Sequence, residues 1–511
     1  MVSEGIIWQM LASTVQRFPD KTAIISKGTA VTYRSFLSEA EITARALAGL
    51  GVKRGDRVCL YLGNRLEFIY IHFAILRLGA VVVPINVTYR RNELKHILVD
   101  SGARFFFTDH IGWSNVSEAK PELPGLRIVI IDSKAPPEGA LSLSSLKSSE
   151  ERLKEPVIGP DDLAAVIYTS GTTGRSKGAM LTHGNFTSNI RDLAGVWKWT
   201  NRDRLLLGLP MFHVHGLGVV LHGVVYTGGS IVLMERFKAE EAMRLISEYQ
   251  CNVFMGVPTM YQLLLGITEP QRYDLSQMRL FVSGSAPLPV KVWQQFREKY
   301  GFEIVERYGL TETIMNTSNP LEGARKAGSV GKALPSVEVR VVDEGGRGVH
   351  LGEVGEILVS GPNVMRGYWN MEDATREALV EGWFRTGDLG YFDEDGYLWI
   401  TGRKKEMIIV GGFKVYPREV EEVLCAHPKV TEAAVLGGPD ELKGEVVRAF
   451  VVAQPGDTPS ERELIEYCGG LLASFKVPVS IQVIDRMPKT ASGKILKGDL
   501  LDLGGHAAIK A

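Results

Sequence analysis

Residues 168–178 read Tyr-Thr-Ser-Gly-Thr-Thr-Gly-Arg-Ser-Lys-Gly, and they follow an apolar run over residues 163–168. The apolar run has the length and composition of a buried strand. The loop after it combines glycines, which let backbone N–H groups wrap an anion, with hydroxyl donors and one lysine. The candidate phosphate contacts are Thr169, Ser170, Gly171, Thr172, Thr173, Gly174 and Lys177. The stretch predicts a phosphate-binding loop without Walker A spacing; a solvated surface turn is the alternative.

Length and composition set broad limits on the protein. A chain of 511 residues is too long for a single hydrophobic core, so two or more domains are expected. A formal net charge of -1 argues against general binding to nucleic acid or to an anionic membrane. The four cysteines lie far apart, without metal-ligand or redox spacing. We therefore expect reduced thiols in a cytoplasmic protein.

Neither a signal peptide nor a membrane span is expected. Residues 1–8 lack the basic segment and the long apolar segment of a signal peptide. Residues 205–234 form the longest stretch without Asp, Glu, Lys or Arg, and they are long enough to span a bilayer. They contain a proline, three histidines and six glycines, which suit a buried, turning core segment better.

Alternating patterns predict an α/β sheet at the start of the chain. Helices are expected over residues 35–50 and 66–78, and strands over residues 57–62 and 81–84. Residues 134–160 are rich in Pro, Ser, Lys and Glu and are expected to form a surface linker.

Three later strands are also predicted. Residues 252–259, 280–288 and 303–313 each run from an apolar strand into small and polar residues. Ligands collect just past the ends of parallel strands, so these ends and the loop predict one crevice.

Several motifs along the chain resemble those of one superfamily. They are residues 168–178, Met211-Phe-His213, Ser283-Gly-Ser-Ala-Pro287, Tyr308-Gly-Leu-Thr-Glu312, residues 382–388, residues 402–420 and residues 487–495, which read Met-Pro-Lys-Thr-Ala-Ser-Gly-Lys-Ile. In this order they resemble the adenylate-forming superfamily, which includes acyl-CoA synthetases, peptide-synthetase adenylation domains and beetle luciferases. The resemblance spans nearly the whole chain.

The resemblance implies an α/β fold in two domains. A large N-terminal domain of β-sheets flanked by helices, with a β-rich subdomain, would occupy residues 1–404 and bind ATP and the acyl group. A small, mobile α+β domain would occupy residues 405–511 and carry the catalytic lysine, with Lys405 at the hinge. Within the β-rich part, residues 391–400 predict a hairpin with Asp395-Gly396 at its turn.

The resemblance also implies a role for each motif residue. Catalysis falls to Lys494, Thr311, Glu312 and His213, with Thr311 at the α-phosphate and His213 beside the reacting carboxylate. Glu312 and Thr169 would hold Mg²⁺, a hard cation that prefers oxygen ligands. The nucleotide would be contacted by Gly284, Ser285, Ala286, Tyr308, Asp388 and Arg403, and coenzyme A would pass Gly411 and Gly412. A metal site is an alternative for His213 with His215, but no third ligand is evident.

The implied activity is ATP-dependent activation of a small-molecule carboxylic acid to an acyl-adenylate, followed by transfer to coenzyme A. The carboxylate is its own nucleophile, so the site needs charge stabilisation rather than a Ser-His-Asp arrangement. ATP and coenzyme A would be co-substrates and Mg²⁺ the cofactor. The alternatives are an adenylation enzyme that loads a carrier protein, a luciferase-like oxygenase and an inactive nucleotide-binding protein. The oligomeric state stays open, a homodimer being one option.

The acid is the least determined feature. Residues 307–320 and 211–216 are similar to malonyl-CoA synthetases, which need a cation for the second carboxylate, but residues 260–264 bring no charge where that family has an arginine. Because burying an unpaired carboxylate is costly, we expect an acid with an apolar tail. A medium- or long-chain fatty acid ranks first, an aryl acid second and malonate third. Candidate walls are Phe212, Val214, Met255, Val257, Met260, Leu310, Ile314 and Met315, and Gly216 and Gly218 would leave depth for a chain.

Overall fold

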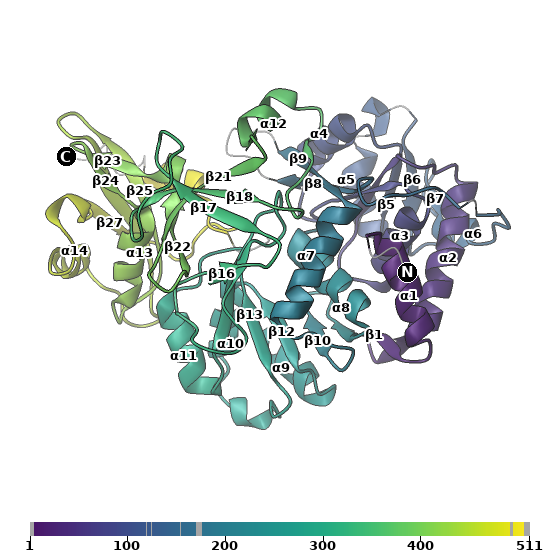
Figure 1. Cartoon of the computed structure of the whole chain (residues 1–511), viewed down its shortest axis with the longest axis horizontal. Helices are drawn as coiled ribbons and strands as arrows, with labels where there is room; N and C mark the ends of the chain where they lie inside the picture. The colour runs from purple at the N-terminus through teal and green to yellow at the C-terminus, as the bar shows by residue number, and fades with distance from the viewer. Residues whose placement is uncertain are drawn as a thin grey trace.

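The computed structural model describes residues 5–118, 120–123, 125–153, 155–169, 176–490 and 494–504. Five of the predicted phosphate contacts lie outside the described residues: Ser170, Gly171, Thr172, Thr173 and Gly174. Figure 1 shows a large body that holds the N-terminus and a smaller C-terminal group of strands and helices at one end of the molecule. The predicted fold class, a large α/β domain with a separate C-terminal α+β domain, is confirmed.

The largest sheet carries the three predicted strand ends. Within the described residues it has nine strands in the order β16-β15-β14-β13-β12-β10-β11-β1-β2, and the central run from β14 to β1 is parallel. Its strands are β1 Thr22–Ser26, β2 Thr29–Thr32, β10 Arg204–Leu207, β11 Ser230–Leu233, β12 Val253–Gly256, β13 Leu280–Ser283, β14 Ile304–Tyr308, β15 Thr317–Ser318 and β16 Lys332–Ala333. Strands β11 to β14 are buried along their whole length, as their continuous apolar sequences predict.

A second sheet contains the strand before the predicted phosphate loop. In the described part of the chain it has eight strands in the order β19-β9-β8-β4-β3-β5-β6-β7. They are β3 Arg57–Tyr61, β4 Val81–Pro84, β5 Phe105–Thr108, β6 Arg127–Ile130, β7 Leu141–Ser142, β8 Leu163–Thr169, β9 Lys177–Thr182 and β19 Gly367–Tyr368. Strand β9 returns antiparallel to β8, so that Thr169 pairs with Lys177 across the loop.

The β-rich subdomain is a third sheet. Its strands are β17 Glu338–Val342, β18 Gly355–Ser360, β20 Leu379–Val380, β21 Trp383–Phe392 and β22 Leu398–Arg403, and all of them pair antiparallel. The hairpin predicted over residues 391–400 is confirmed, since Tyr391 pairs with Trp399 and Gly396 has a positive φ at the turn.

The C-terminal domain is a small sheet with helices. Its strands are β23 Ile408–Val410, β24 Phe413–Val415, β25 Val430–Asp440, β26 Gly444–Ala453 and β27 Ser480–Val483. Its helices are η4 Lys404–Glu406, α13 Pro417–Ala426, α14 Glu461–Gly469, η5 Ser474–Lys476 and α15 Lys497–Gly504. Helix α14 begins at a capping box in which Ser460 accepts from the Glu463 amide. The domain has its own apolar core between α13, α14 and the sheet.

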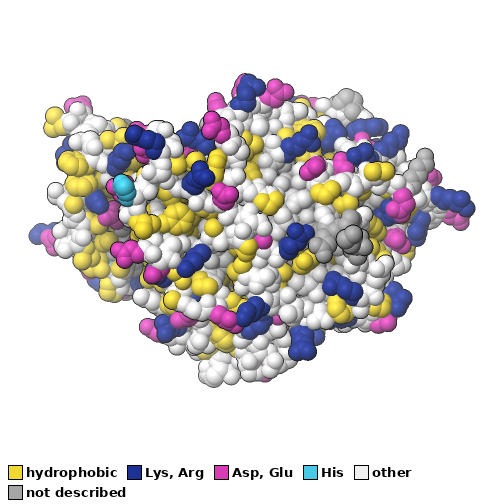
Figure 2. Space-filling model, in the orientation of Figure 1, with side chains coloured by type: hydrophobic (Ala, Val, Ile, Leu, Met, Phe, Trp, Pro, Cys, Tyr) yellow, Lys and Arg dark blue, Asp and Glu magenta, His cyan; other side chains and the backbone are white. Residues whose placement is uncertain are grey.

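Helices of the large domain flank its first two sheets and pack into a continuous apolar core. They are α1 Ile7–Arg17, α2 Tyr33–Gly49, α3 Leu66–Arg77, α4 Arg91–Ser101, α5 His110–Ser117, η1 Lys120–Glu122, α6 Leu143–Leu146, α7 His183–Val196, the π-helix η2 His215–Leu221, α8 His222–Thr227, α9 Ala239–Glu248, α10 Pro258–Leu265, η3 Pro270–Arg272, α11 Val290–Tyr300 and α12 Glu372–Ala378. Helix α7 begins at a capping box of Thr182 with Asn185, and α10 begins with a proline at its first position. Basic and acidic side chains are interspersed over the face in Figure 2, as the near-zero net charge predicts.

One segment differs from its predicted form and a second agrees with it. Residues 134–160, expected as a linker, contain β7 and α6, because Leu143 packs into the main core. Residues 205–234 form β10, η2, α8 and β11, as a turning core segment should. No helix in the described part of the chain combines the length and apolar character that crossing a bilayer requires.

Candidate active site

A buried carboxylate links the large sheet to the β-rich subdomain. The Tyr308 hydroxyl, at the end of β14, donates to Asp388 Oδ2 at 2.6 Å. Arg403 Nε lies 2.9 Å from Asp388 Oδ1, because Asp388 and Arg403 are paired across β21 and β22. Burial raises the pKa of Asp388, and the Arg403 guanidinium opposes that rise. The structure thus brings together three residues that the sequence assigned to the nucleotide.

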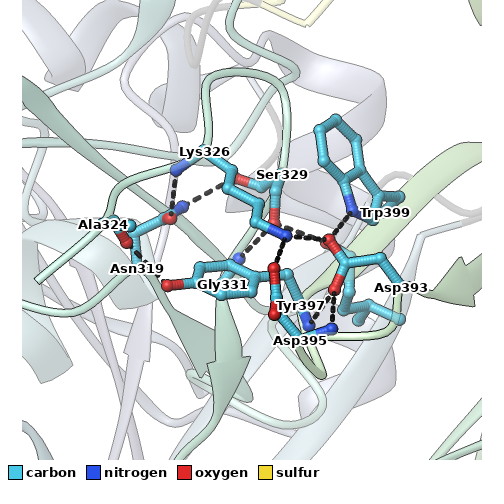
Figure 3. Close-up of polar contacts among 10 residues, drawn as sticks. Asn319, Ala324, Lys326, Ser329, Gly331, Asp393, Asp395, Tyr397 and Trp399 are labelled. Carbon is cyan, nitrogen blue, oxygen red and sulfur yellow. Dashed lines mark hydrogen bonds and ion pairs between the residues drawn. The ribbon is translucent and has the colours of Figure 1, made fainter.

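The hairpin that carries Asp388 and Arg403 is braced against the loop over residues 319–331 (Figure 3). Lys326 Nζ lies 2.6 Å from both Asp393 Oδ2 and Asp395 Oδ2. Trp399 Nε1 also donates to Asp393, and the Tyr397 hydroxyl donates to the Ala324 carbonyl at 2.6 Å. These contacts fix the turn of the hairpin whose two strands carry Asp388 and Arg403.

The charge of Lys494, in the C-terminal domain, influences this carboxylate. Its turn is closed by a hydrogen bond from the Thr490 amide to the Lys494 carbonyl at 2.8 Å. Partial burial and the positive charge of Arg403 lower the pKa of Lys494, whereas Glu406 and Asp388 oppose that shift. The predicted catalytic lysine therefore lies within electrostatic range of Asp388 and Arg403.

Glu312 is joined to the end of the phosphate loop by Tyr368. The Tyr368 hydroxyl donates to Glu312 Oε1 at 3.0 Å, and Lys177 Nζ lies 5.1 Å from the centre of the Tyr368 ring. Strand β19 makes this possible, because Tyr368 pairs with Ala179 on β9. Thr169 and Lys177, which the sequence placed at the phosphates, thereby lie on the strands that lead to Glu312.

The donor set fits a hard divalent cation. Glu312 has no ion-pair partner among the described residues, and burial raises its pKa, so a cation beside it would restore the charged form. Carboxylate and hydroxyl oxygens such as those of Glu312 and Thr169 are ligands that Mg²⁺ prefers. The described residues contain no group of three His, Cys, Asp or Glu side chains that could hold a metal. Substrate phosphates would therefore have to complete the coordination, and the alternative metal site at His213 and His215 is not supported.

The loop that carries Thr311 and Glu312 is tightly wound. Ile314 has φ 56°, a left-handed conformation that is a genuine outlier for a β-branched residue. A Cβ at Gly309 would overlap the Ile314 carbonyl. Asn363 Nδ2 donates to the Thr313 carbonyl at 2.6 Å and to the Met315 carbonyl at 3.1 Å. Strain of about 1–3 kcal/mol persists here because the surroundings fix the loop.

His213, which the sequence predicts to lie beside the acid, has an unpartnered ring nitrogen in the described part of the chain. Its Nε2 is buried and has no hydrogen-bond partner among the described residues. The centroids of the His213 and Phe212 rings lie 4.6 Å apart. Burial lowers the pKa of His213 to about 4, so the ring is neutral at pH 7. Asn64 holds the preceding segment by accepting from the Met211 amide at 2.9 Å. The predicted role of His213 beside a reacting carboxylate stays a prediction that this geometry allows.

Arg307 is a functional candidate that the sequence argument left out. Its side chain is 4% exposed, yet no carboxylate of the described residues lies within ion-pair distance, and its Nε has no hydrogen-bond partner. Arg307 Nη2 donates to Ser285 Oγ at 3.5 Å, and Ser285 Oγ lies 3.3 Å from His215 Nδ1. Neighbouring Glu306 cannot pair with it, because successive residues of β14 point to opposite faces of the sheet.

The predicted adenine segment packs directly against Arg307. Gly284 is buried, and a Cβ there would overlap the Arg307 guanidinium. Ser285 follows with φ 70° and an exposed side chain, while Ala286 is partly buried. The contacts of Gly284, Ser285 and Ala286 with adenine stay predictions. Independently of adenine, position 284 needs glycine because a Cβ there would overlap Arg307.

Gly411 and Gly412 form the turn of the hairpin between β23 and β24. Both have positive φ, at 56° and 85°, as a two-residue type I′ turn requires. Both residues are exposed, and the Gly411 amide donates to the Lys443 carbonyl at 2.8 Å. The proximity of Gly411 and Gly412 to coenzyme A stays a prediction.

Tyr368 and Arg307 show what sequence reasoning missed. Tyr368 lies in a two-residue strand with no motif around it, so no local signal marks it. Arg307 stands inside a quoted motif, but its missing partner becomes visible only when its neighbours in space are known. A charged residue within a buried apolar strand was the available signal.

The chain matches known proteins over nearly its whole length. Residues 11–369 match the family described as AMP-binding enzyme, and residues 419–494 match the AMP-binding enzyme C-terminal domain. A long-chain-fatty-acid–CoA ligase of Bacillus subtilis (strain 168) is 37% identical over 524 residues, covering 96% of this chain and 93% of the relative. ATP-bound MatB from Rhodopseudomonas palustris has a TM-score of 0.91 at 36% identity, over 98% of each chain. O-succinylbenzoate coenzyme A synthetase (MenE) from Bacillus subtilis, in complex with ATP and magnesium ion, has a TM-score of 0.84 at 34% identity, over 96% of this chain and 99% of that one.

Proposed function

The chain belongs to the AMP-binding enzyme family and is an acid–thiol ligase, and from this premise we propose a reaction in two half-steps at the Asp388 crevice. A carboxylate oxygen of the acid attacks the α-phosphorus of ATP, the bond to the β-phosphate breaks, and pyrophosphate leaves. The sulfur of coenzyme A then attacks the acyl carbonyl of the adenylate, AMP leaves, and the thiol proton is released. The observation that carries the proposal is the buried Asp388 carboxylate, which lies 2.6 Å from the Tyr308 hydroxyl and 2.9 Å from Arg403 Nε.

The first half-step brings two anions together, so it depends on fixed positive charge and hydrogen-bond donors. Lys494 supplies a positive charge, and its backbone is held by hydrogen bonds with Thr490. Tyr308 and Arg403 orient Asp388, whose remaining lone pairs would accept the ribose hydroxyls. Mg²⁺, when bound at Glu312 with Thr169, would neutralise phosphate charge. Neutral His213 offers a nitrogen to the reacting carboxylate.

The second half-step calls for a different face of the C-terminal domain. We place the domain boundary and hinge at Lys405, so that rotation would exchange Lys494 for the exposed turn at Gly411 and Gly412. The contacts that a rotation must break include polar ones, as two examples show. Arg418 on α13 donates to the Ile400 carbonyl at 2.9 Å, and Lys291 on α11 donates to the His427 carbonyl at 3.1 Å. A cytoplasmic location and a homodimer remain further predictions.

The predicted walls of the acid pocket are apolar side chains, but the two glycines leave less depth than the sequence suggested. Most predicted walls, Met255 and Met315 among them, are buried in the main core. The Cβ that Gly218 lacks would lie 2.5 Å from the Phe186 ring, and that of Gly216 would overlap the Pro210 carbonyl. The glycines therefore accommodate neighbouring protein atoms and open no channel. A medium- or long-chain fatty acid stays a candidate on the strength of the apolar walls alone.

Arg307 favours a second candidate, a short acid with a distal oxygen acceptor. The guanidinium is buried without a carboxylate, and such a charge is costly unless a ligand compensates it. Through Ser285 it connects to His215, two residues from His213, and His215 Nε2 also lacks a partner among the described residues. A second carboxylate bound there would pair with the guanidinium in the bidentate manner that arginine prefers.

A panel of acids tests both proposals. Pyrophosphate release is measured with fatty acids of several lengths, aryl acids and short dicarboxylates, with coenzyme A present and absent. Acid-dependent release supports the ligase; no release with any acid would contradict it. Preference for a short dicarboxylate that Arg307→Met abolishes supports the arginine site, and Arg325→Met is the matched control, since Arg325 is held only by backbone carbonyls among the described residues. Strong activity on fatty acids, unchanged in Arg307→Met, would exclude that site.

Two readouts separate this activity from the remaining alternatives. Transfer to a carrier protein in place of coenzyme A would identify a carrier-loading enzyme, and light emission with luciferin would identify an oxygenase. ATP–pyrophosphate exchange that depends on an acid would distinguish an enzyme from an inactive nucleotide-binding protein.

A further inference from the structure

Residues 365–370, which we call the bridging segment, hold Glu312 at two points. The Met365 amide donates to the Glu312 carbonyl at 2.7 Å. The Tyr368 hydroxyl donates to Glu312 Oε1 at 3.0 Å. One short segment therefore fixes both the backbone and the carboxylate of Glu312.

The bridging segment is also fixed against β9, the strand that begins at Lys177. Tyr368 pairs antiparallel with Ala179, and the Trp369 amide donates to the Gly178 carbonyl at 2.8 Å. These contacts lie next to Lys177 in the chain. The segment that holds Glu312 is thus tied to the strand that carries the predicted phosphate-binding lysine.

The far end of the bridging segment is anchored to α4 and, through α4, to β8. Trp369 Nε1 and Asn370 Nδ2 donate to the Asp100 carbonyl at 3.0 Å and 2.9 Å. The Asp100 carboxylate accepts from the Tyr168 hydroxyl at 2.5 Å, and Tyr168 lies on β8. The strands on both sides of the predicted phosphate loop are therefore connected to the segment that holds Glu312.

Tyr368 contacts two charged side chains at once. Its hydroxyl meets the Glu312 carboxylate, and Lys177 Nζ lies 5.1 Å from the centre of its ring. An ammonium at this distance is attracted by the negative face of the ring. A hydroxyl carries no charge, so its hydrogen bond orients the carboxylate without neutralising it. Outer partners of this kind orient the ligands of many metal sites.

We propose that Tyr368 is a positioning residue that orients Glu312 toward Mg²⁺ and fixes Glu312 relative to Lys177. The proposal rests on the proposed function and deepens it. Glu312 would hold the cation and Lys177 would meet the phosphates, so their separation has to match one bound triphosphate. The bridging segment sets that separation through backbone pairing, which long side chains alone would not do.

The informative variant is Tyr368→Phe, which removes the hydroxyl and keeps the ring. The Kd for ATP is measured by calorimetry in excess EDTA and in excess Mg²⁺. The first value divided by the second reports what the cation contributes to binding. Loss of an outer partner typically costs about 10- to 100-fold in metal affinity. We expect this ratio to fall roughly tenfold, while the Kd in EDTA stays at its wild-type value.

Two further variants separate the hydroxyl from the ring. Tyr368→Leu also removes the aromatic face, so the Kd in EDTA should rise several-fold, because Lys177 loses its contact with the ring. Glu312→Gln should abolish the effect of Mg²⁺ on ATP binding. Adding Tyr368→Phe to Glu312→Gln should then change the ratio no further, because both substitutions act on one contact.

The matched control is Tyr300→Phe. The Tyr300 hydroxyl donates to the Leu264 carbonyl at 2.5 Å rather than to a carboxylate, so this variant should keep the wild-type ratio. An unchanged ratio in Tyr368→Phe, or an equal rise of both Kd values, would overturn the proposal. So would a further fall when Tyr368→Phe is added to Glu312→Gln. A wild-type protein that binds ATP but releases no pyrophosphate with any acid would instead refute the proposed function.

Discussion

The hydroxyl of Tyr308 and the carboxylate of Asp388 meet at 2.6 Å, where the largest sheet touches the β-rich subdomain. The two residues are 80 positions apart in the chain, and both are buried. The contact fixes the plane of the Tyr308 ring. Asp388 thereby has one donor from β14, Tyr308, and one from β22, Arg403. An aromatic surface and an oriented carboxylate are thus set side by side before any nucleotide arrives.

Replacing Tyr308 with Phe should weaken ATP binding and leave the fold intact. The ring stays, but Asp388 loses a donor, and a hydrogen bond to a charged group contributes about 1.5–3 kcal/mol. We expect the Kd for ATP, measured by calorimetry, to rise roughly tenfold or more. Tyr397→Phe is the control, because that hydroxyl donates to the Ala324 carbonyl and does not contact Asp388. Equal losses in both variants would argue against a specific role for the Tyr308–Asp388 contact.

Replacing Lys494 with Ala should separate the two half-steps. Its charge acts where pyrophosphate departs, so adenylation should slow by roughly 10²–10³, the scale for one preorganised donor. Thioester formation from supplied adenylate should survive. The two rates are measured separately by pyrophosphate release and by thioester absorbance. If both fell by the same factor in a folded protein, the proposed exchange of faces would be wrong.

Arg418 offers a test of the observed domain orientation. It is buried, and it donates to the carbonyls of Ile400 and Gly328 in the large domain. Arg418→Ala would remove these contacts from this orientation and should reduce adenylation several-fold, while thioester formation holds or rises. Arg462→Ala is the control, because Arg462 pairs with Glu466 on the exposed face of α14. A selective loss of thioester formation would contradict the assignment of this orientation to the first half-step.

Glu306 should make the stability of the large domain depend on pH. Burial raises its pKa from 4.5 to about 7, so the folded protein binds this proton more tightly than the unfolded chain does. The free energy of unfolding should therefore fall as pH rises from about 4.5 through about 7, by roughly 3 kcal/mol. Urea denaturation at several pH values should show a flatter dependence for Glu306→Gln than for the wild type. Parallel curves would rule out this contribution.

Much of the fold could be predicted where one local rule decides it. The strand before the phosphate loop follows from a continuous apolar run, and the hairpin at Asp395-Gly396 follows from its turn residues, and both are confirmed. The helix over residues 66–78 was placed to within one residue of α3. Local composition failed over residues 134–160, because burial of Leu143 in a distant core outweighs the polar residues around it.

The residues of the site could be predicted from their motifs, but the contacts between segments far apart in the chain could not. Tyr308, Asp388, Arg403 and Lys494 were chosen one by one, and the structure brings them together. The Tyr368 bridge between Lys177 and Glu312 depends on β19 pairing with β9, a pairing of segments far apart in the chain. The unpaired charge of Arg307 likewise depends on which face of β14 it occupies.

The left-handed backbone at Ile314 makes one position a target for selection on heat tolerance. Glycine or asparagine there would adopt the same φ with less strain, and each removes a buried β-branched side chain. Variants at this position that are recovered from a thermal screen should have higher thermal stability and a lower turnover rate, because a relaxed loop no longer fixes Glu312. Turnover and durability are thus set against each other at the single position of Ile314.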